Sequence, residues 1–93
     1  QEFLVKIEIY TTPTCPYCHA AKELLVSKAV SFDEIIVVDP DRRATMSTRA
    51  EGRTSVPQIF IDDDHIGGCD DLYVLEQTGR LDALISAAKT PSR

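Results

Sequence analysis

Apolar residues alternate along the first part of the chain and then change to a helical spacing. The odd-numbered positions from Phe3 to Ile9 are all apolar, which is the period-2 pattern of a β-strand. Between Ala20 and Leu25 the apolar residues instead recur at helical spacing, with charged residues between them. We therefore predict a strand that is followed by a helix over about residues 16–28.

The middle of the chain predicts another strand and another helix. Residues 30–38 form a nearly continuous apolar run, which is typical of a strand covered on both faces. A strand, a helix and a second strand in this order imply a right-handed crossover and parallel pairing. Asp39-Pro40-Asp41 then supplies the acidic residue and the proline of a helix start. This second helix is mostly polar, and we expect it to pack through Ala44, Met46 and Ala50.

The last third of the chain predicts a hairpin and two helices. Residues 58–61 form a third apolar strand, and the turn at residues 62–65 is too short for a crossover. The chain should therefore return as a short antiparallel strand around Ile66. A helix then opens at Asp70-Asp71, and Gly79 separates it from a last helix with one apolar stripe.

These elements predict a single α/β domain over residues 1–93. Their order is β-α-β-α-β-β-α plus a C-terminal helix, which specifies a four-stranded mixed β-sheet flanked by helices on both faces. A chain of 93 residues is long enough to form one core.

Two cysteines stand where the first strand pattern gives way to the helix. Pro16 suits the first turn of that helix, so Cys15 lies at or just before the helix N-terminus, where a negative charge is favoured. A thiolate is such a charge, and the thiolate is the nucleophilic form of cysteine. The Cys-x-x-Cys spacing between a strand and a helix is typical of a thioredoxin-like redox pair. We expect Cys15 to attack and the more buried Cys18 to resolve the mixed disulfide.

The net charge and the cysteine content limit the kinds of partner and the cellular compartment that we expect. The formal net charge of −5 argues against nucleic acid and against an acidic membrane surface. We find neither an apolar run of membrane-spanning length nor a signal-peptide pattern. Three cysteines are too few for a disulfide scaffold, and a Cys-x-x-Cys pair in this context fits a reducing cytoplasm.

Three segments together carry a family resemblance: Cys15-Pro16-Tyr17-Cys18, residues 55–60 (Ser-Val-Pro-Gln-Ile-Phe) and residues 67–72 (Gly-Gly-Cys-Asp-Asp-Leu). They resemble the dithiol glutaredoxins, most closely those of the bacterial glutaredoxin-3 type. The resemblance implies a thioredoxin-like fold and glutathione-dependent reduction of protein–glutathione mixed disulfides and protein disulfides. It implies glutathione as co-substrate, no tightly bound cofactor, no metal, and a cytoplasmic monomer. The protein substrate implied at family level is ribonucleotide reductase.

The resemblance also assigns roles to single residues. It makes Cys15 the nucleophile that takes glutathione and Cys18 the resolving thiol. It places a cis-proline at Pro57 and gives the Val56 backbone to the cysteinyl part of glutathione. The segment 68–71 would then hold the γ-glutamyl end. The expected glutathione-binding residues are Tyr17, Arg49, Val56, Pro57, Gly68, Cys69, Asp70 and Asp71.

Two positions depart from the family pattern. Thr12 stands where the family usually carries a lysine before the cysteine motif, and Ser55 replaces a threonine but keeps the hydroxyl. Losing the lysine removes a partner for the glycyl carboxylate of glutathione. Arg49 is our candidate to replace it, with Arg53 as an alternative and Lys22 as a weaker one. We therefore expect weaker glutathione use than is usual in the family.

Other interpretations stay open at this point. An iron–sulfur cluster held by glutathione between two protomers is the main alternative from another functional class. A redoxin that thioredoxin reductase recharges is the alternative within redox chemistry. Cys15 to His19 also matches a haem-attachment pattern, but a haem site and a zinc site are both disfavoured. Cys69 is either a small residue at a helix start or a regulatory thiol.

Overall fold

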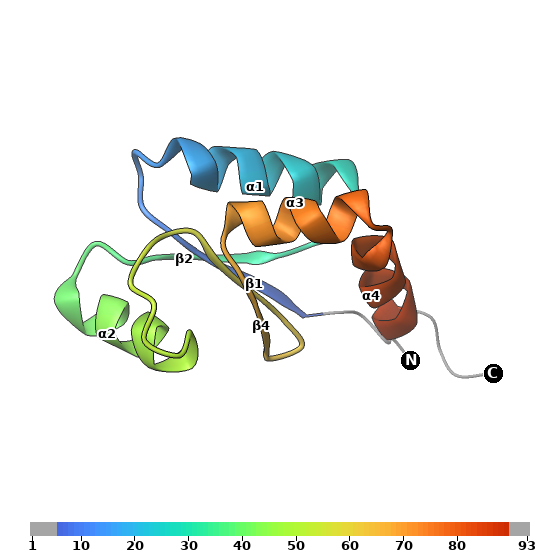
Figure 1. Ribbon diagram of the computed structural model, residues 1–93. Helices are drawn as coiled ribbons and strands as arrows, with labels where there is room; N and C mark the ends of the chain where they lie inside the picture. The colour runs from blue at the N-terminus through green and yellow to red at the C-terminus, as the bar shows by residue number, and fades with distance from the viewer. Residues whose placement is uncertain (1–5, 90–93) are drawn as a thin grey trace.

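The computed structural model describes residues 6–89 and contains the predicted elements in the predicted order (Figure 1). The first half comprises β1 (Ile7–Thr11), α1 (Pro16–Ser27), β2 (Asp33–Ile36) and α2 (Pro40–Arg49). The second half comprises β3 (Gln58–Ile61), β4 (Asp64–Gly67), α3 (Cys69–Gln77) and α4 (Arg80–Lys89). The predicted start of the first strand at residues 3–5 lies outside the described residues.

The sheet has four strands in the order β2-β1-β3-β4. β1 pairs with β2 in parallel and with β3 antiparallel, and β4 returns antiparallel beside β3. The predicted parallel pairing and the predicted hairpin are thus confirmed. Because β1 and β2 run parallel, their carboxyl ends meet at one edge of the sheet, and the loop that leads to Cys15 begins there.

The strand residues alternate between two cores, one on each face of the sheet. Ile9 and Ile59 are register partners on the face that α1 and α3 cover, and both side chains are buried. Tyr10 and Phe60 point to the opposite face, where they pack with Met46 at the centre of α2. Figure 1 shows the same layers, with α1 and α3 above the sheet and α2 below it. Because of the period-2 pattern, alternate residues of a strand enter the cores on opposite faces of the sheet.

Two expectations about burial were wrong. β2 spans four residues at the outer edge of the sheet, and three of them are exposed, so this strand is not covered on both faces. The outermost strand has only one paired neighbour, which leaves its outer flank in water. Ala44 is exposed, whereas Met46 and Ala50 are buried as expected. The packing side of α2 is therefore narrower than we predicted.

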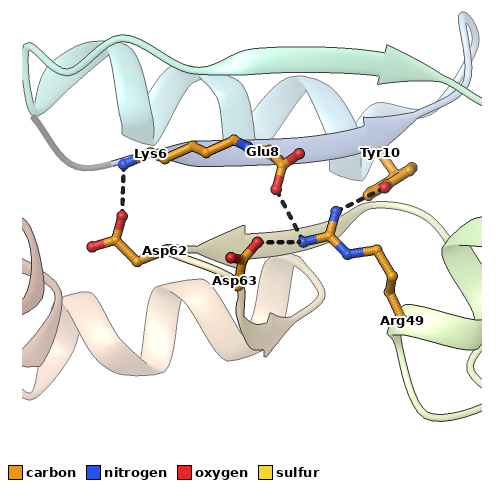
Figure 2. Close-up of polar contacts among 6 residues, drawn as sticks. All are labelled: Lys6, Glu8, Tyr10, Arg49, Asp62 and Asp63. Carbon is orange, nitrogen blue, oxygen red and sulfur yellow. Dashed lines mark hydrogen bonds and ion pairs between the residues drawn. The ribbon is translucent and has the colours of Figure 1, made fainter.

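Arg49 fastens the C-terminal end of α2 to the sheet (Figure 2). Its guanidinium donates to the Tyr10 hydroxyl at 2.9 Å and to a Glu8 carboxylate oxygen at 3.0 Å. It also approaches Asp63 at 3.3 Å and lies 4.1 Å from the centroid of the Phe60 ring. An arginine that stacks on an aromatic ring and pairs with a carboxylate is a stable anchor.

No helix within residues 6–89 is both long and apolar enough to cross a membrane.

Candidate active site

Cys15 occupies the N-cap of α1. Its extended backbone precedes Pro16 in the first turn, and its sulfur accepts the Cys18 amide N–H at 3.1 Å. A side-chain acceptor at this place satisfies one of the free amides of the first turn. The thiol also lies 3.8 Å from the Val56 carbonyl oxygen, to which it donates. Cys15 is partly exposed, so its sulfur combines a donor-rich helix start with access from solvent.

Cys18 sits one helical turn further on and is buried, with 1% of its side chain exposed. Burial, followed by the hydrogen bond to Cys15, raises the pKa of the Cys18 thiol to about 12. The backbone of Thr12 and the charge of Lys22 act on that pKa in the opposite direction. The two cysteines are therefore chemically unequal, and both are free thiols in this structure.

The segment between α2 and β3 brings a backbone turn to Cys15. The Val56–Pro57 peptide bond is cis, as the resemblance led us to expect. The Arg43 side chain from α2 donates to the Thr54 carbonyl oxygen through Nε at 3.1 Å and Nη2 at 2.8 Å. The buried Gln58 side chain donates to the Ser55 carbonyl oxygen at 3.0 Å. The turn is thus held from both sides.

The start of α3 forms the opposite wall. Gly68 is its N-cap, and the Gly68 N–H donates to the Asp71 carboxylate at 2.9 Å, which is one half of a capping box. Gly67 has a φ of +118°, and a Cβ there would overlap the Asp71 carboxylate. A side chain is therefore excluded at Gly67 by its backbone angle and by its neighbour.

These two walls enclose an open pocket of about 330 Å³ beside the cysteine motif. One wall is the cis-proline turn, and the other is the start of α3, where the first backbone N–H groups have no partner within the helix. The lining residues are Tyr17, Arg53, Ser55, Val56, Pro57, Gly68, Cys69, Asp70 and Asp71. Tyr17 is 65% exposed, so its ring is free to cover a ligand.

The structure brings together all the predicted glutathione-binding residues except Arg49. Arg49 does not line the pocket, because Glu8, Tyr10 and Asp63 hold its guanidinium against the sheet (Figure 2). Arg53 lines it instead and lies 3.3 Å from the Asp71 carboxylate. Sequence spacing alone did not separate the two arginines, since the choice depends on the turn after α2.

Sequence reasoning missed a polar network that joins β1, β2 and α1. Glu34 on β2 accepts the Thr11 hydroxyl at 2.6 Å and pairs with the Lys22 ammonium at 2.8 Å. Lys22, followed by Thr11, lowers the pKa of Glu34 below its usual range. In the sequence, Glu34 lies at the centre of the apolar run 30–38, and an acidic residue inside such a run is the signal that could have identified it.

A partly exposed cysteine at a helix start, a buried partner and an adjacent cis-proline on this sheet define a thiol–disulfide oxidoreductase of the thioredoxin fold. The glutaredoxin family model matches residues 7–66. The chain is 54% identical to glutaredoxin 3 of Escherichia coli over 82 residues, which cover 88% of this chain and 99% of that protein. It is also 54% identical to a glutaredoxin of Pseudomonas aeruginosa, over 87% of this chain and 96% of that one.

A solved structure agrees with these relatives. The solution structure of glutaredoxin from Brucella melitensis superposes with a TM-score of 0.80 at 49% identity, over 96% of this chain and 97% of that one. The chain belongs to the glutaredoxin family and is close to the glutaredoxin-3 type. It is a glutathione-dependent thiol–disulfide oxidoreductase.

Proposed function

We propose that Cys15 is the residue that exchanges with disulfides. The observation that carries this assignment is its place at the N-cap of α1, partly exposed to solvent, with its sulfur accepting a hydrogen bond from the Cys18 amide. In the monothiol route the Cys15 thiolate attacks a protein–glutathione mixed disulfide, takes the glutathionyl group and releases the protein thiol. A second glutathione then attacks the new mixed disulfide, which restores Cys15 and yields oxidised glutathione.

Cys18 serves the dithiol route. After Cys15 has formed a mixed disulfide, Cys18 loses its proton to water and attacks the Cys15 sulfur, which expels the bound thiolate. The product is a Cys15–Cys18 disulfide that glutathione reduces. The burial of Cys18 supports this order, because a buried thiol of raised pKa is a poor first nucleophile.

Glutathione occupies the pocket between the cis-proline turn and α3. The Val56 backbone pairs with the cysteinyl part, beside Pro57, and places the glutathione sulfur next to Cys15. The free N–H groups at the start of α3 receive the γ-glutamyl carboxylate, and an Asp70 carboxylate is available to its ammonium. Tyr17 covers the sulfur from the outside.

The glycyl carboxylate of glutathione goes to Arg53. This cation lines the pocket, whereas Arg49 is held elsewhere, and Thr12 offers no charge. Arg53 also faces the Asp71 carboxylate, so it divides its charge between the protein and the ligand. Glutathione binding is therefore weaker than a free lysine at position 12 would make it.

The partners follow from the same chemistry. Glutathionylated proteins and proteins with accessible disulfides are the substrates, with ribonucleotide reductase as the example that the family resemblance suggests. Glutaredoxin couples lie at roughly −200 to −230 mV, close to the cytosolic glutathione poise, so we place the chain in the cytoplasm. It works as a monomer. Visible absorbance after anaerobic purification would instead favour a cluster-bridged dimer.

Two variants test the roles of the cysteines. Turnover of a small glutathione mixed disulfide is followed with glutathione reductase and NADPH. We expect Cys15→Ser to lose activity, because the remaining thiol of the motif, Cys18, is buried, and Cys18→Ser to keep deglutathionylation. Activity that survives in Cys15→Ser would refute the assignment. Activity that requires thioredoxin reductase in place of glutathione would refute the glutathione pocket.

A further inference from the structure

An ion pair between Lys22 on α1 and Glu34 on β2 also contacts the end of β1, so it joins three elements. Glu34 on β2 accepts from Thr11 at the end of β1 and from Lys22 on α1. Thr11 is buried and is followed immediately by the loop to Cys15. Lys22 and Glu34 keep 27% and 32% of their side chains exposed, so neither is part of the packed core.

Lys22 is placed to act on Cys18. The two residues are four apart on α1, so they lie on the same face of the helix, one turn from each other. The Lys22 charge favours the Cys18 thiolate, and it is the smallest of the influences that act on the pKa of Cys18. Glu34 neutralises part of that charge at 2.8 Å. The titratable groups that act on Cys18 are Cys15 and Lys22, both on α1. Among their neighbours, His19 and Lys22 act on Glu34, and Cys15 acts on Cys69.

We propose that Lys22 and Glu34 are positioning residues that set the rate of the resolving step in opposite directions. Lys22 speeds the attack of Cys18 on glutathionylated Cys15, and Glu34 slows it by holding and neutralising Lys22. In this step the Cys18 proton passes to water, the Cys18–Cys15 bond forms, and the Cys15–glutathione bond breaks. The departing glutathione thiolate carries the electron pair and takes up a proton. This inference rests on the proposed role of Cys18.

The opposite directions of the two expected rate changes distinguish this proposal from a purely structural role of the ion pair. If the pair only held α1 to β2, neutralising either partner would loosen the same contact and change the rate in the same direction. If the pair acts through charge, neutralising Lys22 removes a cation from the Cys18 thiolate. Neutralising Glu34 instead frees that cation. The two substitutions then change the rate of closure in opposite directions.

The experiment measures closure directly. The reduced protein is mixed with excess oxidised glutathione, and the second, concentration-independent step is followed by acid quench and mass spectrometry between pH 6 and 9. We expect Lys22→Gln to slow closure and Glu34→Gln to speed it, each by about two- to threefold at every pH. The effect is small because a thiolate loses nucleophilicity as its basicity falls. Lys22→Arg keeps the cation and should restore the rate.

A matched control is available on the same helix. Glu23 is exposed, and Glu23→Gln makes the same change of charge as Glu34→Gln one residue from Lys22. We expect this variant to leave closure within the error of the parent. Rates that change in the same direction in Lys22→Gln and Glu34→Gln, or equal rates in Lys22→Gln and Lys22→Arg, would overturn the proposal. If Glu34→Gln does not fold, the comparison of Lys22→Gln with Lys22→Arg is sufficient to test the proposal.

A different outcome of the same experiment would overturn the proposed role of Cys18. If the parent protein accumulates glutathione on Cys15 and never closes, then Cys18 is not the resolving thiol, and the inference falls with it. If the parent closes but the variants keep its rate, only the inference is overturned.

Discussion

At the scale of single residues, the site depends on an inequality between two cysteines of the same motif. Cys15 caps a helix and meets solvent, whereas Cys18 is one turn inside and buried. Their spacing and Pro16 were sufficient to predict this inequality from the sequence, because a helix start has a fixed geometry. The arginine that serves the pocket was not predictable in the same way. The choice between Arg49 and Arg53 depends on tertiary contacts with Glu8 and Tyr10.

The raised pKa of Cys18 predicts a pH dependence of stability. The folded state holds this thiol neutral up to about pH 12, whereas the unfolded thiol ionises near pH 9. The stability that the folded protein gains by keeping this thiol neutral is therefore fully present below about pH 9, and it is lost as the pH rises toward 12. The free energy of unfolding of the reduced protein should fall by at most about 1.4 kcal/mol per pH unit from this group.

Urea denaturation of the reduced protein between pH 8 and 10.5 measures this slope. The Cys18→Ala variant lacks the ionising thiol but keeps all the other titrating residues. Its free energy of unfolding should therefore fall less steeply with pH than that of the parent. Equal slopes in the two proteins would mean that burial does not hold the Cys18 thiol neutral.

Arg53→Gln should weaken the use of glutathione. The substitution removes one exposed, charge-assisted hydrogen bond, worth about 1 kcal/mol, so the KM for glutathione should rise about fivefold. Stability should change little, because an exposed ion pair such as Arg53–Asp71 contributes about 0–1 kcal/mol. Arg42→Gln is the control, since Arg42 is exposed on α2 and does not line the pocket. A KM that rises equally in both variants would indicate a general charge effect and not a contact with the ligand.

At the scale of elements, the start of α3 carries more of the site than its sequence suggests. The short antiparallel strand predicted around Ile66 is β4, which ends at Gly67. The role of Gly67-Gly68 in the pocket wall depends on a contact, because Asp71 folds back onto the Gly68 N–H and fills the space where a Gly67 side chain would lie. A sequence pattern shows a capping residue, but it does not show which side chain occupies the space beside the cap.

Gly67→Ala should therefore harm both stability and function. The φ of +118° makes any side chain strained, at a cost of about 1–3 kcal/mol, and the added methyl displaces Asp71 from the pocket wall. We expect a lower Tm and a raised KM for glutathione. Gly52→Ala has a matched backbone cost, with a φ of +92°, but its Cβ would meet open space. It should lower the Tm without changing the KM, and a KM unchanged in Gly67→Ala as well would contradict the role given to Asp71.

At the scale of the whole molecule, alternating strand residues build two cores, and the helices on each face bring different parts of the site together. The order of elements and the strand directions were predictable, because periodicity and loop length determine them. The exposure of β2 was not, since an apolar run does not show whether a strand is central or at an edge. The same edge holds Glu34, which contacts both β1 and α1.

The two faces meet at the pocket. α1 and α3, on one face, provide the cysteines and the helix start, while α2, on the other, holds the turn through Arg43 and Thr54 (Figure 1). A ligand in this pocket therefore contacts elements that no single sequence motif contains. That explains why three separated segments were needed to recognise the site.

The most direct measurement is the structure of Cys18→Ser with glutathione on Cys15, determined by crystallography or by intermolecular NOEs. We predict that the tripeptide lies along the Val56 backbone, with its γ-glutamyl carboxylate at the Cys69 and Asp70 amides and its glycyl carboxylate at Arg53. A glutathione that is attached to Cys15 but lies outside this pocket would contradict the proposed site.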